Sequence, residues 1–220
     1  MTQLDDRKRN FIDFALAAGV LRFGRFTLKS GRESPYFFNL GVIASGAGLG
    51  QLGGFYAQAL QTLDPVPDAL FGPAYKGIPL AVATACAYAG ETGSDMPLAY
   101  NRKEAKDHGE GGRLVGAPLE GKRVCIVDDV VTAGTAVREA IGLIREAGAT
   151  PAALIVAIDR EERGRSGKRS AIQELAAEEG ITVKALISFS DVLAWLEESG
   201  SHAEERAALL EYRRQYGATD

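Results

Sequence analysis

Short, largely apolar runs that alternate with longer stretches of helical period constrain the fold of this chain most strongly. The runs lie at 68–72, 97–101, 122–129, 151–159 and 181–189. Strands that are apolar along their length are buried on both faces, and alternation of strands with helices is typical of parallel sheets. The sequence therefore predicts an α/β fold with a mainly parallel sheet flanked by helices, closed by two C-terminal helices.

The N-terminal part of the chain has a different pattern. Apolar residues at helical spacing predict a helix over 7–20, and partial alternation over 21–40 predicts a short antiparallel element with a turn. Between them these two features account for most of residues 1–45. We expect one domain spanning residues 1–220, in which residues 1–45 contribute a small cap, or hood.

Composition limits the class of protein. Of the 220 residues 46% are hydrophobic and 25% charged, which is enough for a packed core. The net charge of −4 argues against a nucleic-acid surface. Neither a secretory signal nor an apolar run long enough for a membrane span is evident, which favours a soluble cytoplasmic protein. Cys86 and Cys125 are predicted to be small buried residues.

The chemistry of the sequence concentrates where the 122–129 run ends. Asp128 and Asp129 follow the buried stretch, and small residues then form a turn into a helix at 132–136. Small residues let backbone N–H groups approach an anion, and a helix N-terminus favours one, so a phosphate monoester fits this turn. Ribose hydroxyls suit the two carboxylates, as does Mg²⁺. The alternative is that Asp129 caps the turn and Asp128 is solvated.

The segment 127–136, VDDVVTAGTA, resembles the motif of the type I phosphoribosyltransferases that binds phosphoribosyl pyrophosphate (PRPP). The resemblance implies that the two acids contact the ribose hydroxyls and that the following turn holds the 5-phosphate. The PRPP-binding residues implied by this motif are Asp128, Asp129, Val130, Val131, Thr132, Ala133, Gly134, Thr135 and Ala136.

Further stretches resemble the orotate phosphoribosyltransferases within that family: TLKSGRESPYFFN at 27–39, FGPAYKGIP at 71–79, YNRKEAKDHGEGG at 100–112 and a DRxERG stretch at 159–164. This likeness implies transfer of the 5-phosphoribosyl group from PRPP to orotate, giving orotidine 5'-monophosphate and pyrophosphate in pyrimidine (UMP) biosynthesis. It also implies a homodimer whose active-site loop is shared between subunits. Mg²⁺ is the implied cofactor, held mainly by PRPP and water.

The same resemblance implies roles for residues outside the central motif. Lys29 would lie over the active site, and Ala74, Tyr75 and Lys76 would form a pyrophosphate loop with a cis peptide bond between Ala74 and Tyr75. The implied orotate-binding residues are Phe37, Phe38, Thr132 and Arg160. The implied catalytic residues, which would also bind PRPP, are Lys29, Arg102, Lys103, Lys106 and His108, the last four in a mobile loop over 101–113.

Arg160, the stretch 101–113 and the function as a whole each have a second interpretation. Arg160 suits the carboxylate of orotate as a bidentate partner, but a surface ion pair within the Glu161–Arg163 cluster is the simpler interpretation. The mixed charges and glycines of 101–113 also suit a solvated loop. For the whole protein, the alternatives are a phosphoribosyltransferase for another base and a regulator that senses PRPP without turnover. The Phe37–Phe38 pair, Lys29 and Arg160 favour an anionic pyrimidine.

Overall fold

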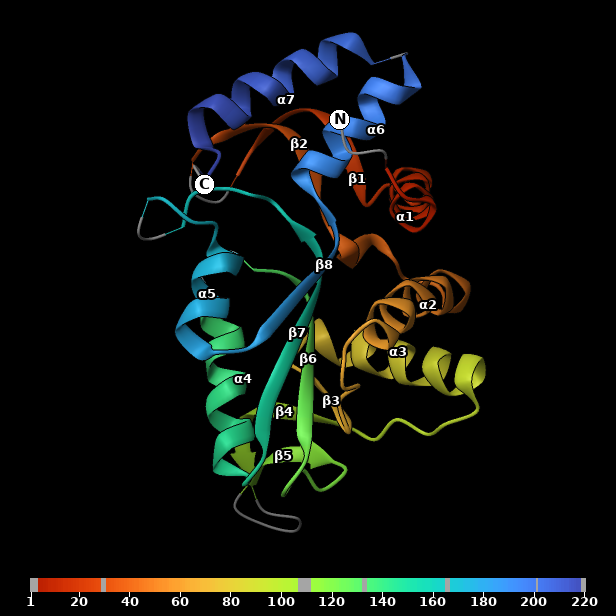
Figure 1. The fold of residues 1–220 in the computed structure, drawn as a ribbon, viewed down its shortest axis with the longest axis vertical. Helices are drawn as coiled ribbons and strands as arrows, with labels where there is room; N and C mark the ends of the chain where they lie inside the picture. The colour runs from red at the N-terminus through yellow and green to blue at the C-terminus, as the bar shows by residue number, and fades with distance from the viewer. Residues whose placement is uncertain are drawn as a thin grey trace.

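The computed structural model describes residues 4–28, 31–106, 112–131, 134–164, 167–200 and 202–218. A six-stranded sheet with the order β5-β4-β3-β6-β7-β8 forms its centre (Figure 1). All neighbouring strands are parallel except the antiparallel pair β4 and β5. The strands of this sheet are β3 (Ala69–Gly72), β4 (Leu98–Lys106), β5 (Gly112–Gly116), β6 (Arg123–Val130), β7 (Thr150–Asp159) and β8 (Thr182–Ser188).

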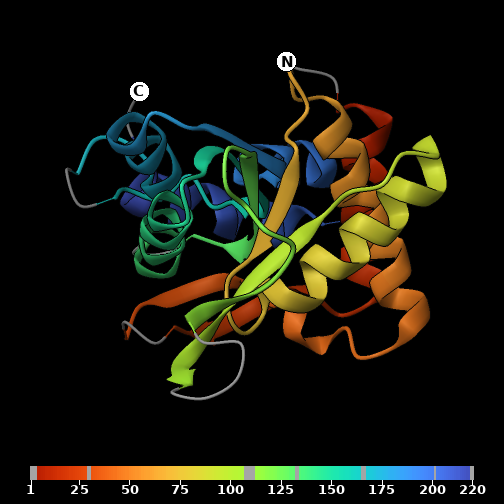
Figure 2. The same ribbon diagram turned by 90° about the horizontal axis from the view of Figure 1, so that it is seen from below.

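Helices cover both faces of this sheet (Figure 2). The helices that do so are α2 (Gly46–Gln61) and α3 (Gly77–Thr92) on one side, and α4 (Thr135–Glu146) and α5 (Ala171–Glu179) on the other. The side chains of β6 alternate between two buried clusters: Cys125 and Val127 join one, while Val124 and Ile126 join the other. The fully apolar character of this strand therefore follows from burial on both faces.

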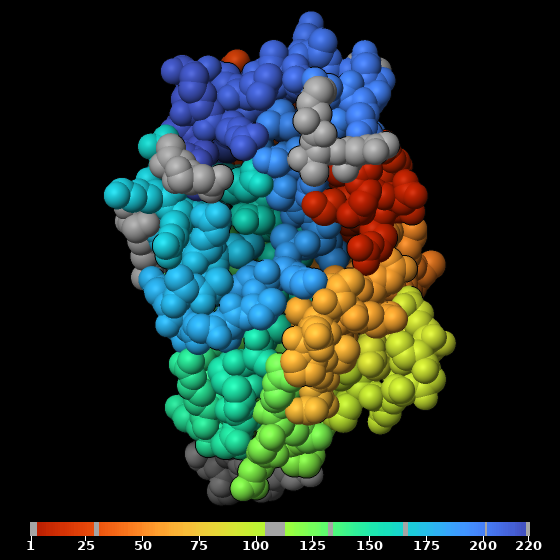
Figure 3. Space-filling view, in the orientation of Figure 1, coloured from red at the N-terminus to blue at the C-terminus, as the bar shows by residue number. Residues whose placement is uncertain are grey.

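One end of the molecule combines the two ends of the chain. Strands β1 (Leu21–Thr27) and β2 (Glu33–Phe38) form an antiparallel hairpin, and β2 contacts α7 (Ala203–Tyr216). Helices α1 (Asp6–Ala17) and α6 (Phe189–Ser199) contact one another beside it. The space-filling view shows α6 and α7 over this end, with α1 next to them (Figure 3).

The predicted α/β class and mainly parallel sheet are confirmed, but several local expectations are not. The stretch at 101–113 was expected to be a loop, yet Asn101 pairs with Leu114 and Lys106 with Gly112 in an antiparallel ladder. Backbone hydrogen bonds stabilise such a ladder, and they do not require apolar residues at regular spacing. The spacing of apolar residues in the sequence therefore did not predict it.

Two further differences concern α2 and Cys86. The helix α2 had no counterpart among the predicted elements, because its sequence is rich in glycine. Packing against α3 requires a glycine at position 53, where a Cβ would lie 2.4 Å from the backbone oxygen of Ala83, whereas a Cβ at Gly46 or Gly50 would meet no atom within 4 Å. Cys125 is buried as predicted, whereas Cys86 is exposed on α3.

Within the described ranges, no helix is both long and apolar enough to cross a bilayer.

Candidate active site

The two acids predicted from the sequence lie at the carboxyl end of β6 and are both buried. The backbone N–H of Asp129 donates to Oδ1 of Asp128 over 2.9 Å, and that of Val130 donates to Oδ1 of Asp129 over 2.8 Å. From α2, the hydroxyl of Tyr56 donates to the backbone oxygen of Asp128 over 2.8 Å. These contacts hold both carboxylates in place at the edge where parallel sheets bind ligands.

Burial changes the acidity of this pair. It disfavours the charged form of Asp128, and repulsion from Asp129 acts in the same direction, so the pKa of Asp128 rises from its ordinary value of 3.8 to about 6. Lys76 opposes this shift, and its Nζ lies 2.6 Å from Oδ2 of Asp129. One acid therefore has a cationic partner, whereas the other is close to half-protonated near pH 6.

Lys76 belongs to the loop that follows β3, which faces these acids. The peptide bond between Ala74 and Tyr75 in this loop is cis, as predicted. The backbone N–H of Ala74 donates to Oδ1 of Asn101 in β4 over 2.9 Å. Asn101 is itself buried, so the loop is anchored to the neighbouring strand while the Tyr75 ring stays exposed.

After β6 the chain turns into α4. Gly134 precedes the helix with φ +70, a backbone conformation that favours glycine. The first helical residues, Thr135 and Ala136, are exposed, so α4 begins at the surface, six residues after Asp129 in the chain. This geometry suits an anion such as a phosphate. Val131 is buried, and Thr132 and Ala133 lie outside the described residues.

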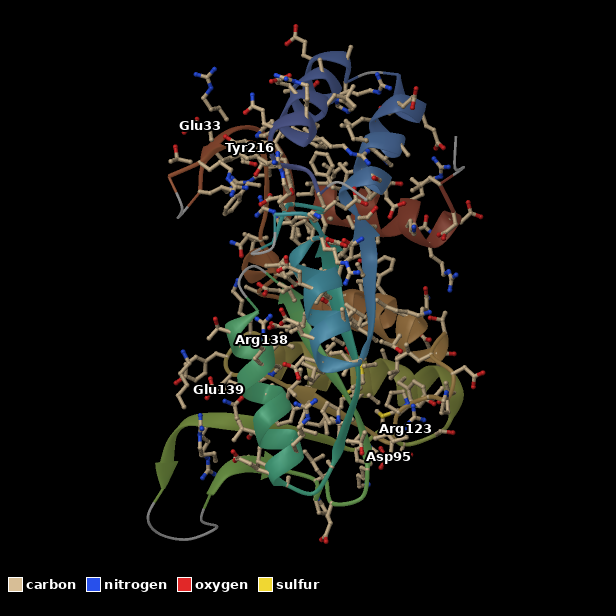
Figure 4. All side chains as sticks on the ribbon, turned by 60° about the vertical axis from the view of Figure 1, so that its left-hand side comes forward. Glu33, Asp95, Arg123, Arg138, Glu139 and Tyr216 are labelled. Atoms are coloured by element: carbon tan, nitrogen blue, oxygen red, sulfur yellow. The ribbon has the colours of Figure 1, made fainter. Side chains whose placement is uncertain are left out.

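Strands β4 and β5 form an arm that carries predicted cationic residues (Figure 2). The Nζ of Lys103 lies 4.7 Å from the ring centroid of Tyr75, so the arm reaches the loop after β3. Arg113 of β5 forms an ion pair with Glu139, which Figure 4 labels on α4. Arg102 is half-buried. Lys106 ends β4, but its side chain, like all of His108 and Lys29, lies outside the described residues.

Arg160 directly follows β7 at the same edge of the sheet. Its Nε donates to Oε1 of Glu162 over 2.8 Å, and its Nη2 lies 2.7 Å from the same oxygen. The guanidinium also lies 5.1 Å from the ring centroid of Tyr36 in β2. The structure thus contains an ion pair within the 161–163 cluster, but not the surface pair of the alternative interpretation, because the two side chains are only 17% and 21% exposed; it also brings Arg160 against the N-terminal hairpin.

Phe37 and Phe38 occupy successive positions of β2 and point to opposite faces of it. Phe38 joins the buried core, while the Phe37 ring stacks against Phe26 with centroids 5.4 Å apart. Because side chains alternate along a strand, the two rings cannot enter one pocket together. A shared pocket for orotate would have to use one ring, or the backbone of both residues.

Some site residues were not identified from the sequence. Tyr56 and Glu162 contact predicted site residues, but the pattern of the sequence gives no signal for either. Asn101 ends the predicted strand at 97–101, so its position at the carboxyl edge was available as a signal. Among the described residues, no group of three or more His, Cys, Asp or Glu side chains is placed to enclose a metal ion.

Comparison with known proteins agrees with this geometry. Residues 45–178 match the phosphoribosyl transferase domain family. The orotate phosphoribosyltransferase of Xanthomonas campestris is 56% identical over 215 residues, which cover 97% of this chain and 98% of the relative. That of Methylococcus capsulatus is 57% identical over 210 residues, covering 96% of this chain and 97% of the relative.

Solved structures show the same likeness. The crystal structure of orotate phosphoribosyltransferase from Francisella tularensis has a TM-score of 0.86 and 40% identity, and it covers 95% of this chain and 100% of that chain. The Mycobacterium tuberculosis orotate phosphoribosyltransferase in complex with PRPP has a TM-score of 0.63 at 21% identity, covering 86% of this chain and 99% of that chain. The latter shares the fold.

Proposed function

The chain belongs to the orotate phosphoribosyltransferases, and we propose that the carboxyl edge of its sheet is where the transfer takes place. It is a transferase that moves the 5-phosphoribosyl group of PRPP to orotate, giving orotidine 5'-monophosphate and pyrophosphate in pyrimidine biosynthesis. The single observation that supports the location is the buried pair Asp128 and Asp129, directly followed by the exposed N-terminus of α4.

PRPP would bind with its 5-phosphate at the turn 132–136 and its ribose hydroxyls at the two acids. Carboxylates accept hydrogen bonds from vicinal hydroxyls, and the N–H groups of α4 donate to the phosphate. In the structure Asp129 is paired with Lys76, and PRPP would separate the two groups. Lys76 would then be available to the pyrophosphate, and Asp129 to the sugar.

The reaction breaks the bond from the anomeric carbon to pyrophosphate as a nitrogen of orotate attacks the opposite face. A transition state of this kind has oxocarbenium character, and the leaving group gains negative charge. The groups proposed to stabilise that charge are Lys29, Lys76, Arg102, Lys103, Lys106 and His108. Val130, Val131 and the Tyr75 ring complete the surroundings of PRPP in this proposal.

Mg²⁺ is the proposed cofactor. When bound, it would screen the charge of the departing pyrophosphate. It dehydrates reluctantly and is commonly bound through substrate phosphates with several waters, so PRPP and water would supply most of its ligands. Two side chains of this protein at the proposed ribose position could also bind the metal: the carboxylates of Asp128 and Asp129 offer oxygen ligands of the kind that Mg²⁺ prefers.

Orotate would bind between the hairpin and the carboxyl edge. Arg160 would pair with its carboxylate, while Thr132 and either one ring of the Phe37–Phe38 pair or the backbone of both residues would complete the pocket. The contact of Arg160 with the Tyr36 ring supports this proposal, because it brings β2 and the end of β7 together. On this view residues 1–45 act as a hood over the base.

We also propose a homodimer in which the β4–β5 arm serves the partner's site. The projection of the arm and the exposure of the Tyr75 ring support this arrangement (Figure 2). The cytoplasm is the proposed compartment, because PRPP is highly charged and does not cross a bilayer unaided.

The experiment that tests the proposed site follows orotate consumption by its ultraviolet absorbance. Consumption is expected only when PRPP and Mg²⁺ are both present, and Arg160→Ala should raise the KM for orotate about tenfold or more, because a charge-assisted contact to the carboxylate is lost. Undiminished consumption without Mg²⁺ would contradict the proposal that Mg²⁺ is the cofactor. An unchanged KM for orotate in Arg160→Ala would contradict the proposed contact between Arg160 and the orotate carboxylate.

A further inference from the structure

Glu162 lies three residues beyond the end of β7 and forms contacts with three other side chains. Its Oε1 accepts from Nε of Arg160 over 2.8 Å and from the hydroxyl of Tyr212 over 2.9 Å. Its Oε2 accepts from Nη1 of Arg32 over 2.9 Å. The side chain is only 21% exposed, so both oxygens depend on these donors for much of their solvation.

The three partners come from distant parts of the chain. Arg32 follows the turn between β1 and β2, where the backbone N–H of Leu28 donates to the oxygen of Arg32 over 2.8 Å. Lys29 lies between these two residues in the sequence. Tyr212 comes from α7, 50 residues beyond Glu162. Glu162 therefore joins the strand end that carries Arg160 to both the hairpin turn and the C-terminal helix.

The backbone reinforces this junction. The N–H of Arg163 donates to the oxygen of Tyr216 over 2.9 Å, and that of Ala218 donates to the oxygen of Glu161 over 2.7 Å. The guanidinium of Arg32 also lies 4.4 Å from the ring centroid of Tyr216. Figure 4 labels Tyr216 at this end of the molecule, next to Glu33 of the hairpin, and the two residues line one hollow.

The charges of this junction suit an anionic ligand. Glu162 lies between two guanidiniums, so its single negative charge leaves one positive charge uncompensated. A carboxylate ligand could therefore join Arg160 without displacing Glu162 from Arg32. Glu162 would also hold the Arg160 side chain in one orientation, and a guanidinium held in place loses less conformational freedom when it binds.

We propose that Glu162 is a positioning residue for orotate: it orients Arg160 and couples it to the hairpin turn and to α7. This inference rests on the proposed contact between Arg160 and the orotate carboxylate. Glu162 itself touches no substrate in this proposal. Its effect should therefore be larger on the binding of orotate than on the binding of PRPP or on the chemical step, which it would reach only through the hairpin turn.

The test compares the steady-state kinetics of Glu162→Gln and Glu179→Gln. Glu179 is a matched control, because it pairs with Arg145 over 2.9 Å and its side chain is 16% exposed. Glu162→Gln should raise the KM for orotate about tenfold, the size of one charge-assisted hydrogen bond, while kcat and the KM for PRPP change less than about twofold. Glu179→Gln should leave all three unchanged. An unchanged KM for orotate in Glu162→Gln, or equal changes in both KM values, would overturn the proposal.

A double-mutant cycle separates this proposal from the assignment of Arg160. If Arg160→Ala raises the KM for orotate and Glu162→Gln adds nothing further, the two residues act as one unit. If the two effects multiply in full, Glu162 does not act through Arg160 and the inference is wrong while the assignment stands. If Arg160→Ala has no effect, the assignment fails and the inference fails with it.

A milder variant covers the case in which Glu162→Gln does not fold. Tyr212→Phe removes one hydrogen bond to Glu162 and keeps the ring. It should raise the KM for orotate about two- to threefold without changing the KM for PRPP, because Glu162 keeps its charge and its contacts with Arg160 and Arg32 and loses one of its donors. An unchanged KM for orotate in Tyr212→Phe would count against the coupling to α7.

Discussion

The carboxyl end of β6 and the β4–β5 arm are proposed to act on the same ligand, yet they are built in opposite ways. Strand β6 lies between β3 and β7, and both of its terminal acids are buried and hydrogen-bonded to the backbone. The arm is paired with β3 only through residues 98–100; beyond them the described ladder is the antiparallel one between β4 and β5, and Lys103 is exposed on it. The groups proposed to hold the sugar in one place are thus anchored in the core. The charges proposed to approach the leaving group lie on the part of the arm that pairs with one other strand, and such edge segments open more easily than the centre of a sheet.

Lys106→Ala tests the contribution of the arm and should have the largest effect. We expect kcat to fall on the order of 10²- to 10³-fold, because a cation that stabilises charge in the transition state is lost. The thermal midpoint should stay unchanged, since Lys106 ends β4 and lies seven residues beyond Ala99, the residue of this strand in the buried cluster. Steady-state kinetics and thermal unfolding measure the two quantities, with Lys122→Ala, at the opposite end of the sheet, as the control. A full kcat with a raised KM for PRPP would show that the arm acts in binding only.

The same variant tests whether the arm is shared between subunits. Lys106→Ala and Asp129→Asn are each expected to be nearly inactive alone. If the arm of one subunit completes the site of its partner, a mixed dimer has one intact site, and equal mixing should restore about a quarter of the parent activity. No recovery would place the arm over the site of its own subunit.

Asp128→Asn tests the cost of burying a carboxylate at the edge of β6. The pKa of Asp128 is about 6 in the fold and 3.8 ordinarily, so the folded protein binds this proton more tightly than the unfolded chain does. The charged form therefore destabilises the fold above about pH 6, and this cost is lost as the pH falls toward 4.

The variant should accordingly be more stable than the parent at pH 8, by about 2–3 kcal/mol, and equally stable near pH 4. Denaturant unfolding in metal-free buffer at several pH values measures this. Its affinity for PRPP should fall, since a carboxylate for the ribose is lost. A gain in stability that is independent of pH would contradict the view that the buried charge of Asp128 is what destabilises the parent.

Arg113→Ala should have the smallest effect. Arg113 and Glu139 are both exposed, and exposed ion pairs contribute about 0.2–1 kcal/mol. We expect less than about fivefold change in kcat/KM, with Arg145→Ala, which removes another exposed arginine of an ion pair, as the comparison. A loss as large as that of Lys106→Ala would mean that this pair, and not the ladder, determines where the arm lies.

Local chemistry made part of this fold predictable. The apolar runs at 122–129 and 151–159 predicted β6 and β7 because each strand is buried on both faces. The helix α2 was not predicted because its five glycines, at 46, 48, 50, 53 and 54, lower its helix propensity. Packing against α3 nevertheless requires a glycine at 53. The outer part of the arm, beyond the predicted strand at 97–101, was not predicted because its polar sequence has no apolar period.

The candidate site likewise has a part that the sequence predicts and a part that depends on tertiary packing. The sequence by itself determined that two acids, a small-residue turn and a helix start follow one another, because these neighbours along the chain remain neighbours at the end of a strand. Only the tertiary structure decided that Lys76 faces Asp129, and that Arg160 meets Tyr36 and shares Glu162 with Arg32. Arg32 and Glu162 are 130 residues apart in the chain. Such pairs form only because packing of the sheet and the terminal segments brings their backbones together, and no local pattern encodes that distance.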